Sequence, residues 1–205
     1  MMTENLAEHS LFHTYDNEPM RPDDRRRLWV AVPLVALVFL LTPFVTQAQS
    51  MNNPATIEQR LQTIEDKTAL KRLVDTFSNL ADTKDVAAQV LLFTEDATVT
   101  SISGGEAGST FAGRKAISDA FAGYLANFET VYHINGQQTV ELNGDTATGT
   151  AYCLVVLIAD ENGKKIKNTA GVIYHDAYVR QDGQWLIAKR TSNFTWRDRE
   201  EMAAN

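Results

Sequence analysis

The chain contains one cysteine, Cys153, among its 205 residues, and only five prolines. A single cysteine cannot form an intramolecular disulfide, and it cannot build a zinc site by itself. Two histidines, His133 and His175, lie after residue 48, so we expect no structural metal. The sequence also lacks a G-x-S-x-G nucleophile turn and an H-E-x-x-H helix. We therefore expect neither a metal nor a cofactor.

Positive charge is scarce in the body of the chain. Residues 49–205 contain 15 basic and 20 acidic residues, with no tract of Lys or Arg. Binding to phosphate backbones depends on cationic contacts, so nucleic acid is not an expected partner. The composition, 44% apolar and 22% charged, is ordinary for a globular domain. It excludes a wholly disordered or collagen-like chain.

A long hydrophobic run occurs once, from Leu28 to Val45, and it contains no charged residue. Arginines at positions 21 and 25–27 precede this run, and Thr46-Gln47-Ala48 follows it. Cations, then an apolar run, then small residues are typical of a secretory signal, here cleaved after Ala48. We predict a signal peptide at residues 20–48 and an exported mature protein, either periplasmic or secreted.

The alternative is an uncleaved membrane anchor that carries an exported domain. The run is at the lower limit for a spanning helix, which needs about 17–20 residues, and it contains Pro33 and Pro43. Contact with a membrane is expected only in that case. Residues 1–19 are polar, and we interpret them as a disordered leader or as a mis-assigned start upstream of Met20.

After a lead-in at residues 49–55, we predict one domain at residues 56–197 and a polar tail at 198–205. Apolar spacings of three and four residues predict three amphipathic helices. The first follows Pro54, the second spans residues 84–93 with Thr83 as its N-cap, and the third spans 113–128. The apolar stripe of the first helix comprises Ile57, Leu61, Ile64, Leu70, Leu73, Val74, Phe77 and Leu80.

The remaining segments have the composition and alternation of strands. The predicted strands are residues 97–102, 110–112, 130–142, 146–160, 165–180 and 184–196. The last four are separated by hairpin-turn signals, namely Asn143-Gly144, Glu161-Asn162-Gly163 and Asp182-Gly183. Helices followed by strands in tight hairpins predict an α+β domain with a curved, mostly antiparallel sheet. Such a sheet encloses a concave interior, where small ligands usually bind.

Five local motifs match a known family in their order along the chain. They are Phe93-Thr94-Glu95-Asp96-Ala97-Thr98-Val99, Gly113-Arg114-Lys115-Ala116-Ile117, His133-Ile134-Asn135, Gly144-Asp145-Thr146-Ala147 and Asp182-Gly183-Gln184-Trp185-Leu186-Ile187. Over residues 56–197 the chain resembles SnoaL-like proteins of the NTF2-like superfamily, in the branch of scytalone dehydratase and hexachlorocyclohexane dehydrochlorinase. The resemblance implies a cone-shaped, cystatin-like α+β barrel that forms homodimers or homotrimers. It also implies a pocket for a small apolar or polycyclic molecule.

Asp82 is the first candidate catalytic residue. It follows the last apolar residues of the first helix, where the helix dipole disfavours an anion, and a carboxylate in such a field is a better proton acceptor. The alternative is that Asp82 caps the second helix. By resemblance, Asp82 matches the aspartate of the family's Asp–His pair. The tyrosine that precedes this aspartate in scytalone dehydratase is replaced by Ala81.

His133 is the second candidate catalytic residue. It interrupts a strand otherwise built from apolar and polar uncharged residues, and a lone strand histidine is often structural. By resemblance, it matches the catalytic histidine of the family. A histidine oriented by an aspartate is a common general base.

Four further residues are candidates for substrate binding. Tyr174 and Asp176 share one face of a strand, which is either the pocket or a solvated outer face, whereas His175 points to the opposite side. Arg190 and Phe194 are expected at the mouth of the pocket, with a surface position as the alternative for Arg190.

Three functions remain open from the sequence: a cofactor-free lyase, isomerase or hydrolase, a non-catalytic binder, and an interaction domain. An alternating apolar row at Tyr152, Leu154, Val156 and Ile158 also predicts self-association through one face of the sheet.

Overall fold

The computed structural model describes residues 55–203. The predicted leader, the signal peptide and the lead-in up to residue 54 lie outside the described residues. The elements are α1 (Ile57–Asp82), α2 (Val86–Gln89), the 3₁₀ turn η1 (Val90–Leu92), β1 (Phe93–Ser103), β2 (Glu106–Ala112), α3 (Arg114–Leu125), β3 (Thr130–Asn143), β4 (Thr146–Glu161), β5 (Lys164–Gln181) and β6 (Gln184–Glu201). The α+β fold class predicted from the sequence is confirmed. No helix in this part of the chain is long and apolar enough to cross a membrane.

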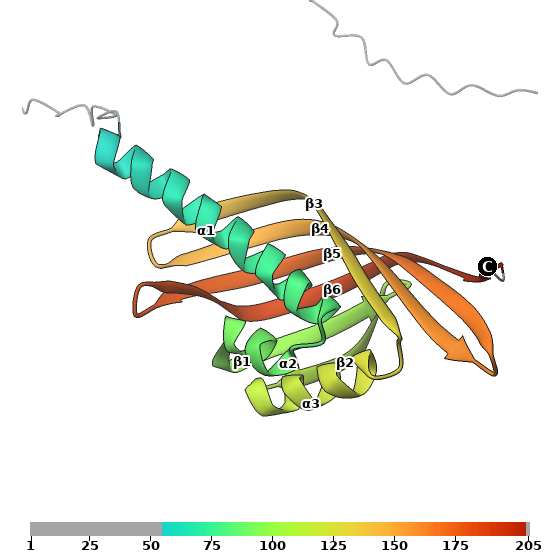
Figure 1. The fold of residues 1–205 in the computed structure, drawn as a ribbon. Helices are drawn as coiled ribbons and strands as arrows, with labels where there is room; N and C mark the ends of the chain where they lie inside the picture. Colours follow the sequence, from blue (N-terminus) through green and yellow to red (C-terminus); the bar gives the residue numbers. More distant parts are fainter. Residues whose placement is uncertain (1–54, 204–205) are drawn as a thin grey trace, which may run out of the picture. The chain divides into compact units, whose positions relative to one another are not determined.

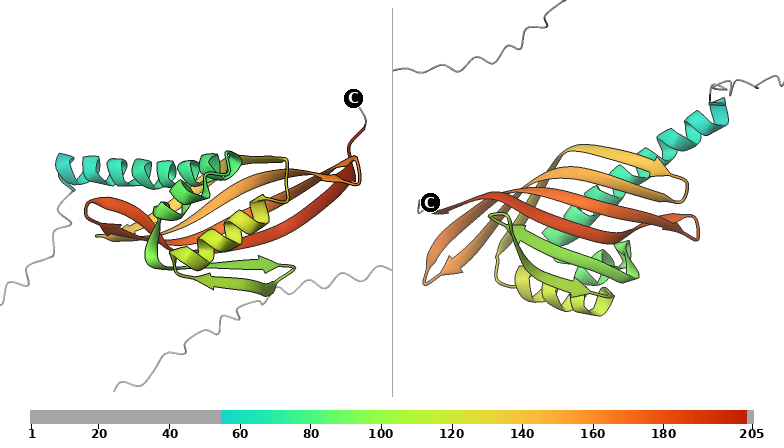
Figure 2. Two further views of the ribbon diagram at one scale, coloured as in Figure 1. Left: turned by 60° about the horizontal axis from the view of Figure 1, so that its bottom comes forward. Right: turned by 180° about the vertical axis from the view of Figure 1, so that it is seen from behind.

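The six strands form one curved sheet in the order β2-β1-β6-β5-β4-β3 (Figure 1). All neighbours are antiparallel except β1 and β6, which are parallel. The helices lie on the concave face of this sheet, and no described helix covers the opposite face (Figure 2). We call that opposite side the outer face. The interior between the helices and the sheet is therefore the place where a ligand can be enclosed.

α1 begins with a complete capping box. The side chain of Thr56 accepts a hydrogen bond from the backbone of Gln59, and the Gln59 side chain accepts one from the backbone of Thr56. The second half of the helix packs on the sheet through Leu70, Val74 and Phe77, which are all buried. The helix thereby places its last residue, Asp82, over β3.

The first half of α1 departs from the expectation. Ile57, Leu61 and Ile64 have the spacing of a buried stripe, but their exposed fractions are 76%, 53% and 62%. This end of the helix extends beyond the sheet, so there is nothing among the described residues for it to pack on (Figure 1). The spacing predicted the helix correctly but not the burial of these three residues.

Other boundaries also differ from those predicted. The second helix is only four residues long and continues as η1, and Asp85, not Thr83, is its N-cap through a 3.0 Å bond from the Ala88 amide. β6 continues to Glu201 because it stays paired with β5, so residues 198–201 belong to the sheet and not to a tail.

Candidate functional site

Asp82 is the last residue of α1, and its side chain caps no helix. Because Asp85 caps α2, the alternative of Asp82 as an N-cap is wrong. Both carboxylate oxygens of Asp82 instead reach one residue on β3. Oδ1 lies 2.6 Å from Nδ1 of His133, and Oδ2 accepts a 3.3 Å hydrogen bond from the backbone N–H of His133. The helix end and the strand are thus joined at this residue pair.

Strand alternation decides where His133 points. Its neighbours Tyr132 and Ile134 are exposed by about half on the outer face. The His133 side chain points inward and is only 8% exposed, compared with 23% for Asp82. When the imidazole is neutral, its Nδ1–H donates a hydrogen bond to the carboxylate of Asp82. Nε2 is then left as the acceptor, which is the arrangement of a general base.

Burial controls the protonation of His133. Removal from water is the largest influence on the pKa of His133 and lowers it. The hydrogen bond and the charge of Asp82 raise this pKa, and the charge of Arg190 lowers it. The resulting pKa of His133 is below its ordinary value of 6.5. The imidazole is therefore predominantly neutral at pH 7, with its basic nitrogen free.

His133 lines a cavity inside the cone with a volume of about 130 Å³. The apolar part of the lining comprises Phe77, Ala81, Phe121, Tyr124, Leu125, Val155, Leu157 and Phe194. The polar part comprises Gln89, His133, Tyr174 and Ser192. Edge-to-face contacts of Phe77 with Phe121 and with Tyr174 hold three of the rings in place. The cavity is therefore small and mostly apolar.

A larger open space adjoins the cavity. It has a volume of about 670 Å³, and it shares Tyr124, Leu157 and Phe194 with the cavity lining. We call it the vestibule. Phe194 therefore lies between the cavity and the vestibule, and the guanidinium of Arg197 stacks 4.1 Å from the centre of its ring. Phe194, which the sequence analysis expected at the mouth of a pocket, lines both the cavity and the vestibule.

Arg190 is not at the mouth and not on the surface. It is completely buried, and its guanidinium donates two hydrogen bonds of 2.8 and 2.7 Å to the two oxygens of Asp176. It also lies 4.2 Å from the ring centre of Phe77 and 4.3 Å from that of Tyr174. Burial disfavours its charge, but the charge of Asp176 and the hydrogen bonds outweigh this effect, so its pKa is raised. The surface alternative for Arg190 is wrong.

Asp176 faces the interior, so the solvated outer face considered for its strand is also wrong. Besides Arg190, it accepts a 2.7 Å hydrogen bond from the hydroxyl of Tyr178. Neither Asp176 nor Arg190 lines the cavity, and both lie behind the rings that do. The structure thus brings Asp82, His133, Tyr174 and Phe194 to the cavity region and places Arg190 and Asp176 together as a buried ion pair.

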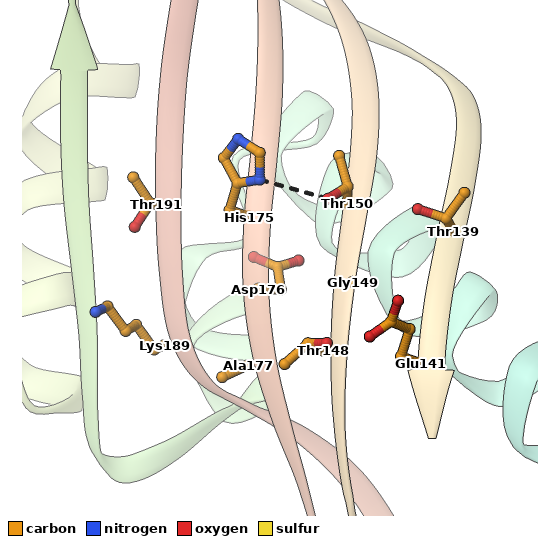
Figure 3. A pocket seen from close by; sticks show the side chains of 10 residues that line it. All are labelled: Thr139, Glu141, Thr148, Gly149, Thr150, His175, Asp176, Ala177, Lys189 and Thr191. Atoms are coloured by element: carbon orange, nitrogen blue, oxygen red, sulfur yellow. Dashed lines mark hydrogen bonds between the residues drawn. The ribbon is translucent and has the colours of Figure 1, made fainter. Parts of the chain in front are cut away.

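His175 points away from all of these residues. It lies in a shallow groove on the outer face together with several threonines and Lys189, and its Nδ1 is 3.4 Å from the Thr150 hydroxyl (Figure 3). Cys153 is buried in the core, and burial raises the pKa of its thiol to about 11. A thiol that stays protonated is a poor nucleophile, so Cys153 is not a candidate nucleophile. His175 is not part of the site because it lies on the outer face.

Two polar lining residues were not identified from the sequence. Gln89 lies on α2 and is only 1% exposed. The available signal was a lone glutamine between apolar residues, seven positions after Asp82. Ser192 lies on β6, two residues after the inward-facing Arg190, so strand alternation could have placed it inside.

The geometry defines a cone-shaped α+β domain with an Asp–His pair at an apolar cavity. The family model of the SnoaL-like domain matches residues 62–191, and the chain belongs to this family. No curated protein matches the chain.

Solved structures share the fold. A scytalone dehydratase-like protein from Novosphingobium aromaticivorans is 20% identical, with a TM-score of 0.60 over 71% of this chain and 94% of its own. An NTF2-like protein with a cystatin-like fold from the same organism is 25% identical, with a TM-score of 0.53 over 70% and 91%. Hexachlorocyclohexane dehydrochlorinase LinA-type3 from Novosphingobium barchaimii is 17% identical, with a TM-score of 0.58 over 71% and 96%.

Proposed function

We propose that this protein binds a small, largely apolar molecule in the cavity and acts on it as a cofactor-free lyase or isomerase. The 2.6 Å contact between Asp82 and an inward-facing His133 carries this proposal. His133 is the general base, and Asp82 is the positioning residue that fixes its tautomer. The names of the dehydratase-like and dehydrochlorinase structures agree with this type of chemistry.

The proposed reaction is a proton transfer within the cavity. Nε2 of His133 takes a proton from a carbon or a hydroxyl of the substrate, and the Asp82 carboxylate stabilises the resulting imidazolium. In a lyase, the electron pair of the broken C–H bond forms a double bond while the bond to the leaving group breaks. The imidazolium then returns the proton to the leaving group. In an isomerase, the proton returns to a neighbouring carbon. General acid–base catalysis of this kind contributes about a hundred- to ten-thousand-fold in rate.

Cavity volume limits the substrate. A cavity of about 130 Å³ accommodates roughly one ring, since benzene occupies an engineered cavity of about 150 Å³. A polycyclic molecule has to place its remaining rings in the vestibule, past Tyr124 and Phe194. We therefore expect single-ring compounds to enter without rearrangement of the protein.

Two variants test the proposal. In a screen of small alicyclic, aromatic and polyketide-like compounds, His133→Ala and Asp82→Asn should each lower turnover at least a hundredfold while the fold is retained. His175→Ala is the matched control because His175 lies on the outer face, and its turnover should stay unchanged. If both the His133 and the Asp82 variants keep the turnover of the unmodified protein, the chemistry takes place elsewhere. Saturable binding without turnover would instead favour the non-catalytic binder, which the absence of a tyrosine at position 81 supports.

We also propose that the domain is exported and that it self-associates. The charge-flanked apolar run at residues 28–45 supports export, and mass spectrometry of the native protein would show Gln49 as the first residue. Exposed side chains of Tyr132, Ile134 and Tyr152 on the uncovered outer face support a homodimer or homotrimer (Figure 2).

A further inference from the structure

Gln89 has a buried hydrogen-bond acceptor without a partner. Its side chain lines the cavity and is 1% exposed. The amide nitrogen Nε2 donates a 3.0 Å hydrogen bond to the backbone carbonyl of Phe77 on α1. The amide oxygen Oε1 accepts no hydrogen bond from any described residue.

The bond to Phe77 fixes the orientation of the amide. Reversing the amide would place Oε1 against a carbonyl oxygen, and two acceptors cannot bond each other. Oε1 is therefore the open atom. A buried acceptor that is left unsatisfied is destabilising, and such atoms are uncommon in folded proteins. Tyr124, Tyr174 and Ser192 have the hydroxyls of the lining, and none of them donates to Gln89.

We propose that Gln89 is a specificity-determining residue that accepts a hydrogen bond from a hydroxyl group of the ligand. The substrate class is then a small, neutral, single-ring alcohol or phenol, since the rest of the lining is mostly apolar and the cavity accommodates about one ring. This inference rests on the proposed function only in requiring that the ligand occupies the cavity. It does not depend on catalysis by His133.

Gln138 provides a matched control. It is a second glutamine whose Nε2 donates to an α1 carbonyl, that of Leu70 at 3.5 Å. Its buried Oε1 also has no partner within residues 55–203. Gln138 does not line the cavity. Replacing either glutamine with leucine removes one amide bond to α1, but only the change at Gln89 alters the cavity.

The experiment compares phenol with toluene and anisole, which have similar size but no hydroxyl donor. Binding to the full-length chain is followed by NMR of isotope-labelled histidine, where His133 reports on the cavity and His175 on the outer face. We expect phenol to bind about tenfold more tightly than toluene or anisole, because the latter two leave Oε1 unpaired. The difference should disappear in Gln89→Leu and persist in Gln138→Leu.

The possible results separate this inference from the proposed function. If all three probes shift His133 with equal affinity, the cavity binds rings but Gln89 does not select a hydroxyl, and a bound water satisfies Oε1 instead. If Gln89→Leu keeps the preference for phenol, the inference is also wrong. If no probe shifts His133, the cavity is not a binding site and both proposals fail. The comparison of phenol with toluene in the unmodified protein needs no variant, so a misfolded variant does not prevent the test.

Discussion

Replacing Asp176 with asparagine tests whether the buried ion pair is needed for the fold. The pair is fully enclosed, with side-chain exposures of 0% for Arg190 and 1% for Asp176. Asparagine preserves the shape of the side chain but removes the charge that faces the guanidinium. The two charge-assisted hydrogen bonds become weaker, and the Arg190 cation stays buried without a counter-charge.

The expected loss of stability is large. Removing one partner of a buried ion pair typically costs about 3–5 kcal/mol, and a whole domain is stabilised by about 5–15 kcal/mol. Urea unfolding followed by tryptophan fluorescence measures the change in the free energy of unfolding. In the exposed pair between Lys164 and Glu201, Glu201→Gln should change stability by less than about 1 kcal/mol.

A double variant separates lost charge compensation from general damage. Arg190→Met keeps much of the apolar stem and removes the buried cation. The variant with both Asp176→Asn and Arg190→Met should therefore be more stable than Asp176→Asn alone, because no uncompensated charge remains. A cost below about 1 kcal/mol for Asp176→Asn would refute the reasoning. The reasoning would also be refuted if the double variant were less stable than Asp176→Asn alone.

Three further predictions concern pH, assembly and packing. Because the pKa of His133 in the folded protein is below 6.5, the contribution of the neutral imidazole to stability is fully present above about pH 6.5 and decreases as the pH falls through that lowered pKa. A pH series of urea unfolding should show this loss of stability, and the loss should be smaller in His133→Gln. Turnover that depends on neutral His133 should likewise persist to lower pH than for an ordinary histidine, and a pH–rate profile with an apparent pKa above 6.5 would contradict this. Sedimentation should show a dimer or trimer at micromolar concentration and a shift to monomer in Tyr152→Lys, whereas a monomeric unmodified protein would rule out assembly through the outer face. Gly171→Ala should lower stability and change tryptophan fluorescence, since its Cβ would lie 2.2 Å from the Trp196 ring nitrogen, whereas Gly123→Ala in α3 meets no atom within 4 Å and should be neutral or stabilising.

The hairpins were predictable because their turns depend on local chemistry. Gly144, Gly163 and Gly183 all have positive φ, as do the adjoining Asn162 and Asp182. The turns at these residues were predicted from the sequence signals, and their positions set the ends of the four long strands. The alternation along β3 then predicts that His133 is on the opposite side from Tyr132 and Ile134.

The partner of Arg190 was not predictable in this way. The tight turn at Asp182-Gly183 pairs Gln181 with Gln184, and counting back along both strands sets Asp176 opposite Lys189. An irregularity in the register between Ala177 and Tyr178 shifts the pairing by one residue, so that Asp176 lies opposite Arg190. No residue pattern in the strands marks this irregularity, and without it an arginine on the last strand looks like a surface residue.

The two aspartates of the interior differ in what neutralises them, and this difference defines the chemistry of the site. Asp176 has a permanent cation, Arg190, and a tyrosine hydroxyl, so its charge is compensated whatever occupies the cavity. Among the described residues, the Asp82 side chain bonds only to His133, and burial favours the neutral form of that imidazole. In the proposed reaction, His133 takes up a proton beside this carboxylate, and the resulting imidazolium is paired with Asp82. We therefore expect the inner cavity to favour a neutral ligand over an anionic one, because an anion would lie close to the Asp82 carboxylate.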